Sequence, residues 1–302
     1  MSPKRRSSSK LTVSFISTAL ILCVALLVFF TNGQGESITD FLGITTFDKE
    51  QDFVRILDVG QSDSILIYSN GYSALIDTAT EEYGEEICTE LSRCGIERLD
   101  VLLITHLDSD HSGGVNSLVA NYKISNLILP ELSVESEGIT KAQLAINSVT
   151  RCGGEIYTAV QGMNFTIGEF TVTVLAAFDK MSDENNRSVI VMAEMDGKKF
   201  LFTGDMESKA EEALLKENLD INCDVLKVAH HGSSSSTTEK FLAATTPKYA
   251  AISVGDNSYG HPTKKVLNRL SNTGAEILRT DKSGNITFNV KNGEITVNCE
   301  KE

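Results

Sequence analysis

The sequence predicts a mixed α/β (α+β) fold in which two β-sheets pack face to face and helices cover their outer faces. Short apolar runs closed by turn residues recur along the chain, as expected of strands, and amphipathic helical patterns lie between many of them. The dipeptide Asn70-Gly71 is a hairpin signal, whereas later strands alternate with helices, so antiparallel and parallel pairs should both occur. Two sheets with outer helices are one of the few layered arrangements that bury all these apolar faces.

The composition is that of a folded globular protein. Of the 302 residues, 41% are hydrophobic and 23% are charged, which allows a sizeable core and excludes an intrinsically disordered chain. All 41 acidic residues but only 23 of the 27 basic ones follow residue 30, so this part carries a formal charge of −18. Such a charge argues against tight binding along an extended nucleic acid. The six cysteines form no CxxC pair, which predicts neither a disulfide framework nor a zinc knuckle.

The first 50 residues divide into three segments. Residues 11–30 carry no charge, and a helix of this length, about 30 Å, crosses a bilayer. The preceding head, residues 1–10, is basic, which places the N-terminus in the cytoplasm. We therefore expect a single-pass anchor in the cell membrane, a polar linker at 31–50 and an extracytoplasmic domain at 51–302. The alternative is a cleaved signal peptide and a secreted domain, although the apolar run exceeds the usual length of about 7 to 15 residues.

The strands and helices follow in order along the domain. The first amphipathic helix places Ile87 and Leu91 four residues apart before a glycine stop at Gly95. Strands are expected at 53–59, 64–68, 74–77, 99–105, 126–129, 155–160, 171–175, 188–195, 199–203, 224–229, 249–254, 276–279 and 285–290. Helices are expected at 81–94, 140–151, 208–217, 237–244 and 263–273.

The densest group of ligand-type side chains follows the expected strand 99–105. It is the run His106-x-Asp108-x-Asp110-His111. Imidazole and carboxylate groups suit Zn, Mn or Fe, and a two-metal site needs several of them, with one carboxylate free to bridge. A solvated acidic loop is the structural alternative. Against it, two of the chain's five histidines stand at the ends of this six-residue run.

The other three histidines and one further aspartate also stand where apolar strands end. They occur in the segments Thr203-Gly204-Asp205, Lys227-Val228-Ala229-His230-His231-Gly232-Ser233 and Tyr259-Gly260-His261-Pro262. Each segment has a structural alternative. Asp205 could cap the following helix, the serines after His231 could cap the next one, and His261-Pro262 could be a helix entry.

Six motifs in this order carry a family resemblance. They are Asp58-Val59-Gly60-Gln61-x-Asp63, Thr105-His106-x-Asp108-x-Asp110-His111-x-Gly113-Gly114, Thr203-Gly204-Asp205, Lys227-Val228-Ala229-His230-His231-Gly232-Ser233, Tyr259-Gly260-His261-Pro262 and Arg279-Thr280-Asp281. Together they resemble the metallo-β-lactamase-like domain at the C-terminus of ComEC-type competence proteins. The resemblance spans about residues 53–290 and implies an αββα sandwich with a metal site at one edge, between the sheets.

The resemblance also implies roles for the site residues. Two divalent ions, Zn or Mn, would be held by His106, Asp108, Asp110, His111, Asp205, His230 and His261. Asp205 would be the bridging carboxylate. We expect His230 as the ligand because it directly follows a strand, with His231 as a proton donor or phosphate contact. Asp110 would be essential to catalysis, and Lys227 would act as a nearby charge; the alternative for Lys227 is a solvated side chain at a strand edge.

Two departures from the superfamily's usual pattern bear on the metal. Asp108 stands where the commoner motif has histidine, and the added negative charge favours a harder metal such as Mn beside Zn. No histidine lies between His111 and Asp205, so the usual third-motif ligand is missing, and Asn185-Asn186-Arg187-Ser188 occupies that stretch. Both departures resemble the ComEC-like branch.

The resemblance implies a membrane-anchored, metal-dependent hydrolase that acts through a metal-activated water as a phosphodiesterase or nuclease. Its substrate would be a phosphoester, and the negative charge of the domain favours a small molecule or a short or single-stranded nucleic acid. One alternative is a lactamase or thioester hydrolase, which shares the water chemistry. Another is a non-catalytic, membrane-tethered binding protein of the competence or envelope machinery. The sequence identifies no protein partner.

Overall fold

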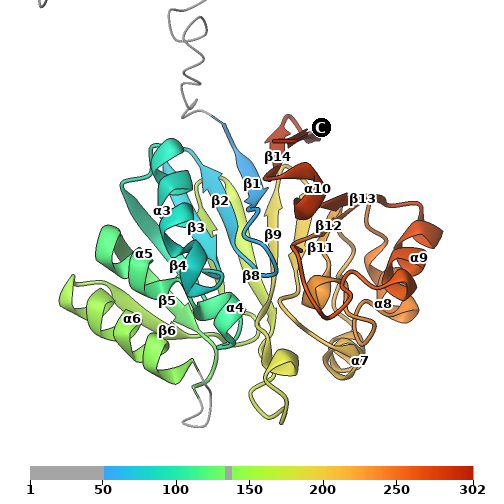
Figure 1. Ribbon diagram of the computed structural model, residues 1–302, viewed down its shortest axis with the longest axis horizontal. Coiled ribbons are helices and arrows are strands. Elements are labelled where there is room, and N and C mark those ends of the chain that lie inside the picture. Colours follow the sequence, from blue (N-terminus) through green and yellow to red (C-terminus); the bar gives the residue numbers. More distant parts are fainter. Residues whose placement is uncertain (1–50, 133–137, 302) are drawn as a thin grey trace, which may run out of the picture. The chain divides into compact units, whose positions relative to one another are not determined.

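Strands fill the centre of the domain and helices flank it (Figure 1). The structure, a computed structural model, describes residues 51–132 and 138–301, which belong to the compact unit Lys49–Glu302. The expected head, anchor and linker within residues 1–50 lie outside the described residues and remain predictions. Among the described residues, no helix is long and apolar enough to cross a membrane.

The first sheet has eight strands and contains the expected hairpin. Its strands from β15 to β3 pair antiparallel and those from β3 to β6 pair parallel. At the turn between β2 and β3, Asn70 and Gly71 both have positive φ, 50° and 82°, as a two-residue hairpin of this kind requires. In spatial order the strands are β15 (Glu294–Cys299), β14 (Ile286–Lys291), β1 (Phe53–Ile56), β2 (Ile65–Ser69), β3 (Tyr72–Ile76), β4 (Arg98–Leu103), β5 (Lys123–Leu129) and β6 (Glu155–Thr158).

The second sheet has seven strands. Its strands from β13 to β10 pair parallel, and those from β10 to β7 pair antiparallel. In spatial order they are β13 (Glu276–Arg279), β12 (Tyr249–Ile252), β11 (Val225–Lys227), β10 (Lys198–Phe202), β9 (Ile190–Met195), β8 (Phe170–Ala176) and β7 (Asn164–Ile167). Because parallel strands end at the same edge of a sheet, β10, β11 and β12 deliver the segments after them to one edge.

Helices cover the outer face of each sheet (Figure 1). The first sheet carries α3 (Gly84–Arg93), α5 (Val115–Asn121) and α6 (Ile139–Arg151), and the second carries α7 (Ser208–Lys216), α8 (Glu239–Thr245) and α9 (Lys264–Thr273). The short helical turns are η1 (Glu81–Tyr83), α4 (Ser109–Ser112), η2 (Asn185–Arg187), η3 (Ala229–Gly232) and α10 (Thr280–Ser283). Two of these turns, α4 and η3, lie at the ends of strands and carry the histidine motifs.

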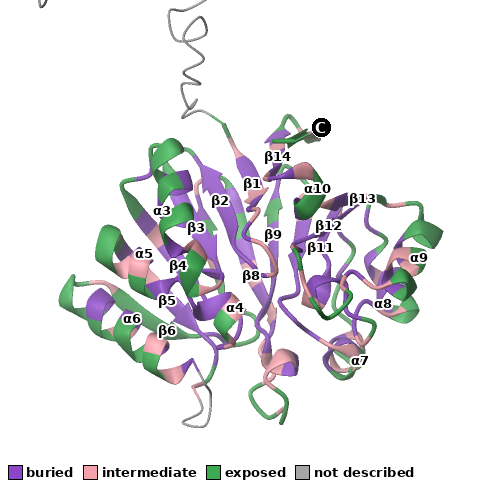
Figure 2. Cartoon of the chain, viewed as in Figure 1, coloured by how far each residue is buried: buried purple, intermediate pink, exposed green. Residues whose placement is uncertain are grey.

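The main core lies between the two sheets, whose central strands are buried (Figure 2). Phe200 of β10 packs edge-on against Phe170 of β8, with ring centroids 6.0 Å apart, and against Phe288 of β14, with centroids 6.2 Å apart. Burying each such side chain contributes about 1.5–3 kcal/mol. Since Phe288 belongs to the first sheet and Phe200 to the second, the contact between their rings joins the two sheets whose edges form the site.

The structure confirms two packed sheets with outer helices, and every expected strand overlaps an observed one. Besides the short helical turns α4, η2, η3 and α10, three elements were missed: β7, β15 and α5. Most side chains of β7 and β15 are exposed or half-buried, so their apolar alternation is weak. The helix α5 has only seven residues, of which Val115 and Leu118 are buried, too few to show a helical period.

Candidate metal centre

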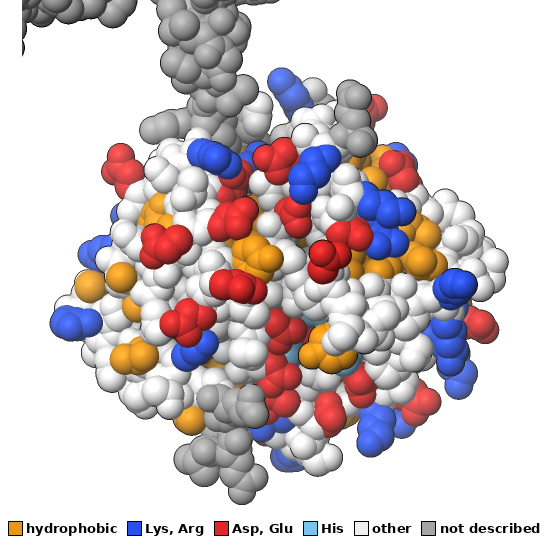
Figure 3. All heavy atoms as spheres, viewed as in Figure 1, with side chains coloured by type: hydrophobic (Ala, Val, Ile, Leu, Met, Phe, Trp, Pro, Cys, Tyr) orange, Lys and Arg blue, Asp and Glu red, His pale blue; other side chains and the backbone are white. Residues whose placement is uncertain are grey.

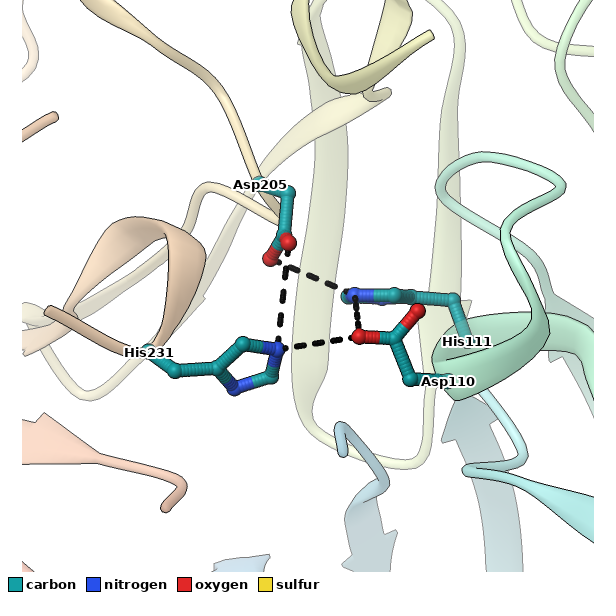
Figure 4. A group of neighbouring side chains, drawn as sticks. All are labelled: Asp110, His111, Asp205 and His231. Atoms are coloured by element: carbon teal, nitrogen blue, oxygen red, sulfur yellow. Dashed lines mark hydrogen bonds and ion pairs between the residues drawn. The ribbon is translucent and has the colours of Figure 1, made fainter. Parts of the chain in front are cut away.

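Four donor side chains meet at the edge where strands of both sheets end: Asp110, His111, Asp205 and His231 (Figure 4). Their ligand atoms lie within 4.8 Å of one another. The Nε2 atom of His111 lies 3.2 Å from Oδ1 of Asp205. The Nε2 atom of His231 lies 3.3 Å from Oδ2 of Asp110 and 3.7 Å from Oδ2 of Asp205. We call these four residues the donor cluster.

The two sheets contribute equally to the donor cluster. Asp110 and His111 lie in α4, shortly after β4 of the first sheet. Asp205 follows β10 of the second sheet, and His231 lies in η3 directly after β11. Four donors that are up to 121 positions apart in sequence therefore meet only when the sandwich has formed.

Asp77 fixes the orientation of His111. This buried aspartate follows β3, and its Oδ2 accepts a hydrogen bond from Nδ1 of His111 at 2.7 Å. Its carboxylate also accepts hydrogen bonds from the backbone N–H and the hydroxyl of Thr105, both at 2.7 Å. With the proton of His111 held on Nδ1, Nε2 presents its lone pair to the donor cluster, an arrangement typical of metal-bound histidine. Sequence reasoning missed Asp77, although its place at the end of an apolar strand is the same signal that marked the other ligands.

A backbone carbonyl fixes His231 in the same way. The Nδ1 atom of His231 donates a hydrogen bond to the carbonyl oxygen of Ser253, 2.9 Å away, and the side chain is 2% exposed. The backbone of His230 and His231 has positive φ, 51° and 50°, a region that non-glycine residues rarely occupy. This backbone, and not the sequence order, decides which of the two adjacent histidines enters the donor cluster.

The stretch that lacks the third-motif histidine supports Asp205 instead. The hydroxyl of Ser188 accepts a hydrogen bond from the backbone N–H of Asp205 at 3.0 Å. The Oδ1 atom of Asn186 accepts from the backbone N–H groups of Glu207 and Ala210, both at 3.2 Å, and so caps α7. Asp205 is therefore free for the donor cluster, and the helix-capping role considered for it is filled by Asn186.

Gly204 allows this close packing. It has φ of 49°, and a Cβ atom there would lie 2.8 Å from the hydroxyl of Ser188. Its carbonyl accepts a hydrogen bond from the backbone N–H of His230 at 3.2 Å, which joins the loop after β10 to η3. Any side chain at Gly204 would strain the backbone and displace Ser188, the partner of Asp205.

Lys227 is buried beneath the site and does not touch the cavity. It is fully buried, and its Nζ lies 2.7 Å from Oδ2 of Asp63, which is also buried. The expected alternative of a solvated strand-edge lysine is wrong, because β11 is an interior strand of the sheet. The other oxygen of Asp63 lies 3.6 Å from Nδ1 of His231. Lys227 is thus separated from His231 by Asp63 and has no contact with the cavity.

Opposite charges outweigh burial at each member of the donor cluster. Burial raises the pKa of Asp110, but the hydrogen bond from His231 and the charge of His111 lower this pKa to about 2. Burial is likewise overcome at Asp205, where the charges of His111 and His231 hold the pKa well below its ordinary value. Burial lowers the pKa of His111 and His231, yet the charge of Asp205, helped by Asp77 and Asp110, raises both. The site therefore favours bound positive charge.

The buried polar atoms at the site fit a metal ion. The Nε2 atoms of His106 and His111 and the Oδ1 atom of Asp205 are buried, and within residues 51–132 and 138–301 none of them has a hydrogen-bond partner. Unpaired buried nitrogens and oxygens of this kind are costly unless a ligand satisfies them. Two imidazoles and two carboxylates are ligands that Zn and Mn accept.

His106 and Asp108 lie beside the donor cluster but not within it. The rings of His106 and His111 are 4.0 Å apart, and Nε2 of His106 lies 3.6 Å from Oδ2 of Asp108. The side chain of Asp108 is 39% exposed, whereas that of His106 is fully buried. The Nδ1 atom of His106 lies 3.2 Å from the hydroxyl oxygen of Thr105 and 3.4 Å from that of Ser188. The pair could complete a second ion position next to the first.

His230 and His261 form part of the cavity wall. The Nε2 atom of His230 lies 3.6 Å from Oδ2 of Asp205, and its Nδ1 lies 3.4 Å from Oε1 of Glu207. The ring of His261 stands 5.6 Å from that of His230, and Gln61 Nε2 lies 3.4 Å from its Nδ1. The four-donor grouping contains neither histidine. The sequence favoured His230 over His231 as the metal ligand, whereas this geometry favours His231.

A cavity of about 830 Å³ opens above the donor cluster. Its lining includes many carboxylates and no lysine or arginine among the described residues. Figure 3 shows acidic side chains gathered around the hollow in which histidine is visible. The acidic lining residues are Asp58, Glu82, Glu86, Asp108, Asp110, Asp205, Asp256 and Asp281.

Comparison with known sequences identifies one protein family and a set of competence proteins. The family model described as "Metallo-beta-lactamase superfamily" matches residues 57–256. ComE operon protein 3 of Bacillus subtilis (strain 168) is 34% identical over 261 residues, 79% of this chain and 33% of that protein. Competence protein ComA of Neisseria gonorrhoeae is 32% identical over 287 residues, 91% of this chain and 39% of that protein. These matches confirm the resemblance to ComEC-type proteins, although the chain spans only about a third of these relatives' length.

Solved structures share the fold at low sequence identity. The metallo-β-lactamase fold protein YhfI from Bacillus subtilis has a TM-score of 0.55 at 12% identity and covers 79% of this chain and 100% of its own. CmlA, a diiron β-hydroxylase from Streptomyces venezuelae, has a TM-score of 0.53 at 11% identity and covers 80% of this chain and 54% of its own. Together with the sheet topology, these likenesses confirm the αββα sandwich.

Proposed function

Because this chain belongs to the metallo-β-lactamase superfamily, we propose that it is a metal-dependent hydrolase that cleaves phosphodiesters. The observation that carries the proposal is the donor cluster. Two imidazole nitrogens, each with its proton held on the opposite ring atom, and two carboxylates converge beneath a solvent-accessible cavity. Folding alone does not require these four side chains to converge, and two of their buried ligand atoms, Nε2 of His111 and Oδ1 of Asp205, have no hydrogen-bond partner among the described residues. Metal-dependent hydrolysis requires such a convergence.

Different residues of the site would bind the metal and protonate the leaving group. Asp110, His111, Asp205 and His231 would hold a metal ion, which when bound supplies Lewis acidity toward a substrate oxygen and the attacking water. His230 lies on the cavity wall beside Asp205, so we assign it the protonation of the leaving group. His231 does not suit that role, because its Nδ1 is committed to the carbonyl of Ser253 and its Nε2 to the donor cluster.

The proposal includes two ions, Zn or Mn. His106 and Asp108 would supply the donors of the second position, and Asp205 is the expected bridging carboxylate. Aspartate at position 108 replaces a softer imidazole, and a carboxylate-rich site accepts Mn more readily than an all-histidine site does.

We place this activity at the cell membrane. The apolar stretch at residues 11–30 would anchor the chain, with the N-terminus in the cytoplasm and the hydrolase domain outside it; release after signal cleavage is the alternative. The named relatives are competence proteins, which makes nucleic acid a candidate substrate. The acidic cavity favours a short or single-stranded one over a long duplex.

One observation favours a second candidate, the hydrolysis of a lactam or thioester. The described cavity lining has no lysine or arginine that could pair with a substrate phosphate. A neutral acyl substrate would not need such a partner, and the metal chemistry would be the same. A non-catalytic role without bound metal would leave Nε2 of His111 and Oδ1 of Asp205 buried without a hydrogen-bond partner among the described residues.

Hydrolysis of bis(4-nitrophenyl) phosphate by the full chain with Mn or Zn tests the proposal. We expect turnover that EDTA removes and added metal restores. Asp110→Ala should abolish it, whereas Glu97→Ala, an exposed carboxylate away from the cavity, should not change it. A parallel panel with a β-lactam and a thioester separates the second candidate. Equal turnover by the wild type and by Asp110→Ala would exclude the proposed mechanism.

A further inference from the structure

We propose that Tyr259 at the cavity mouth is a stacking platform for a nucleobase, so that the substrate is a phosphodiester attached to a nucleoside. This inference rests on the proposed phosphodiesterase function and names its substrate class. Tyr259 lines the cavity and is 75% exposed, the highest value among the large hydrophobic side chains with notable exposure. The catalytic proposal makes no use of it.

The ring of Tyr259 continues a row of rings that leads toward the donor cluster. It is stacked on His261, with centroids 5.7 Å apart and an interplanar angle of 27°. His261 meets His230 edge to face at 5.6 Å, and His230 lies beside Asp205. His261 thus stacks on one face of the tyrosine ring. The other face is available for stacking by a planar group close to the reacting phosphate.

The loop that presents Tyr259 is held by a single asparagine. The side chain of Asn257 accepts a hydrogen bond from the backbone N–H of His261 at 3.0 Å and donates one to the carbonyl of His261 at 2.9 Å. It also donates to the carbonyl of Gly255 at 2.9 Å. A ring presented from an ordered loop loses little freedom when a ligand stacks on it, which makes stacking effective there.

The charge of the cavity explains why stacking is needed. A protein that binds a nucleotide usually holds its phosphate with lysine or arginine, and the described lining has neither. The metal ions could capture one phosphate, but the acidic lining would repel others. Stacking on an aromatic ring is independent of charge and tolerates every base, so it suits a cavity that accepts one or two nucleotides.

A pair of matched substrates tests the platform. The full chain with Mn is given a thymidine dinucleotide and an analogue in which hydrogen replaces both bases, and cleavage is followed by chromatography. The readout is the ratio of the two kcat/KM values. We expect the wild type to prefer the thymidine dinucleotide and Tyr259→Ala to lose about tenfold of that preference, whereas Tyr259→Phe, which keeps the ring, should retain it. Tyr72→Ala, a half-exposed tyrosine that is not part of the cavity, is the matched control.

Two results keep this inference separate from the proposed function. If the wild type cleaves both dinucleotides and Tyr259→Ala has the same preference as the wild type, the platform is refuted and the phosphodiesterase stands. If the wild type cleaves neither, the proposed function is refuted. In that case, calorimetry measures the Kd of thymidine 5′-monophosphate as an independent test of the platform. A Kd about tenfold weaker in Tyr259→Ala than in Tyr259→Phe supports the platform, and equal Kd values overturn it.

Discussion

The run of residues 106–111 contains two pairs of metal-ligating side-chain types, and the surrounding structure orients one pair better than the other. Asp110 and His111 join Asp205 and His231 in the donor cluster, whose two histidines are each oriented by a hydrogen bond on the far ring nitrogen. The neighbouring pair, His106 and Asp108, has a 3.6 Å contact, a half-exposed carboxylate and only hydroxyl groups near the far ring nitrogen. The first group is built as a complete set of ligands, and the second is not.

For the proposed two-ion site, this difference predicts that the two positions have unequal affinity. A histidine whose far nitrogen donates to a carboxylate or carbonyl is held in one tautomer and binds metal more tightly. Ser188 occupies the stretch where the superfamily commonly supplies another histidine, and here it supports the backbone of Asp205 instead. In the proposed two-ion site, the position at the donor cluster would be the stronger one and the second position would depend on Asp108.

Asp205→Asn should have the largest effect, because Asp205 belongs to the donor cluster and is the bridging carboxylate of the proposed two-ion site. We expect kcat/KM for a phosphodiester to fall by more than about 100-fold, since even residues that only orient a ligand are worth 10- to 100-fold. Steady-state kinetics of the full chain measure this loss. Glu212→Gln, an exposed residue of α7, is the control. Activity within a few-fold of the wild type would mean that Asp205 does not hold the metal.

Asp77→Asn should have an intermediate effect and act only on the stronger position. The substitution removes the charge that orients His111, so metal affinity should weaken by about 10- to 100-fold. Competition with a fluorescent chelator measures the affinity. An unchanged affinity would contradict the orienting role assigned to Asp77.

Lower pH should weaken metal binding progressively. The acidic neighbours raise the pKa of His111 and His231 in the metal-free chain, so both imidazoles carry protons below those raised values. A metal must displace these protons, and its affinity should therefore fall as the pH drops, starting above the ordinary histidine value of about 6.5. Metal titrations at several pH values measure the trend. An affinity independent of pH between about 8 and about 6 would contradict it.

Asp108→His should have the smallest effect and change the metal preference rather than the activity of the stronger position. The substitution restores the superfamily's commoner residue and adds a softer ligand beside His106. We expect the second position to favour Zn over Mn by about tenfold more than in the wild type. Competitive loading followed by elemental analysis measures the ratio. A ratio equal to that of the wild type would show that Asp108 does not contact the second ion.

The sequence was sufficient to predict the sandwich and most of the site, because ligand-type residues stood at the ends of apolar strands. His111 and Asp205 were found in this way. The sequence order favoured His230 over His231, whereas the geometry favours His231, because the placement of the two side chains depends on two consecutive residues with positive φ. The burial of Lys227 depends on Asp63, which is 164 positions earlier and reaches it only in the folded sandwich. Asp77 also follows an apolar strand, but its hydrogen bond to His111 becomes visible only once β3 lies beside β4.

Elemental analysis of the purified full chain tests the central claim most directly. The account predicts at least one bound Zn or Mn per chain in the wild type, retention of that ion in His230→Ala, and its loss in His231→Ala when both variants unfold cooperatively. Near-zero metal in the wild type, or loss in His230→Ala with retention in His231→Ala, would contradict the assignment of the donor cluster as the metal centre.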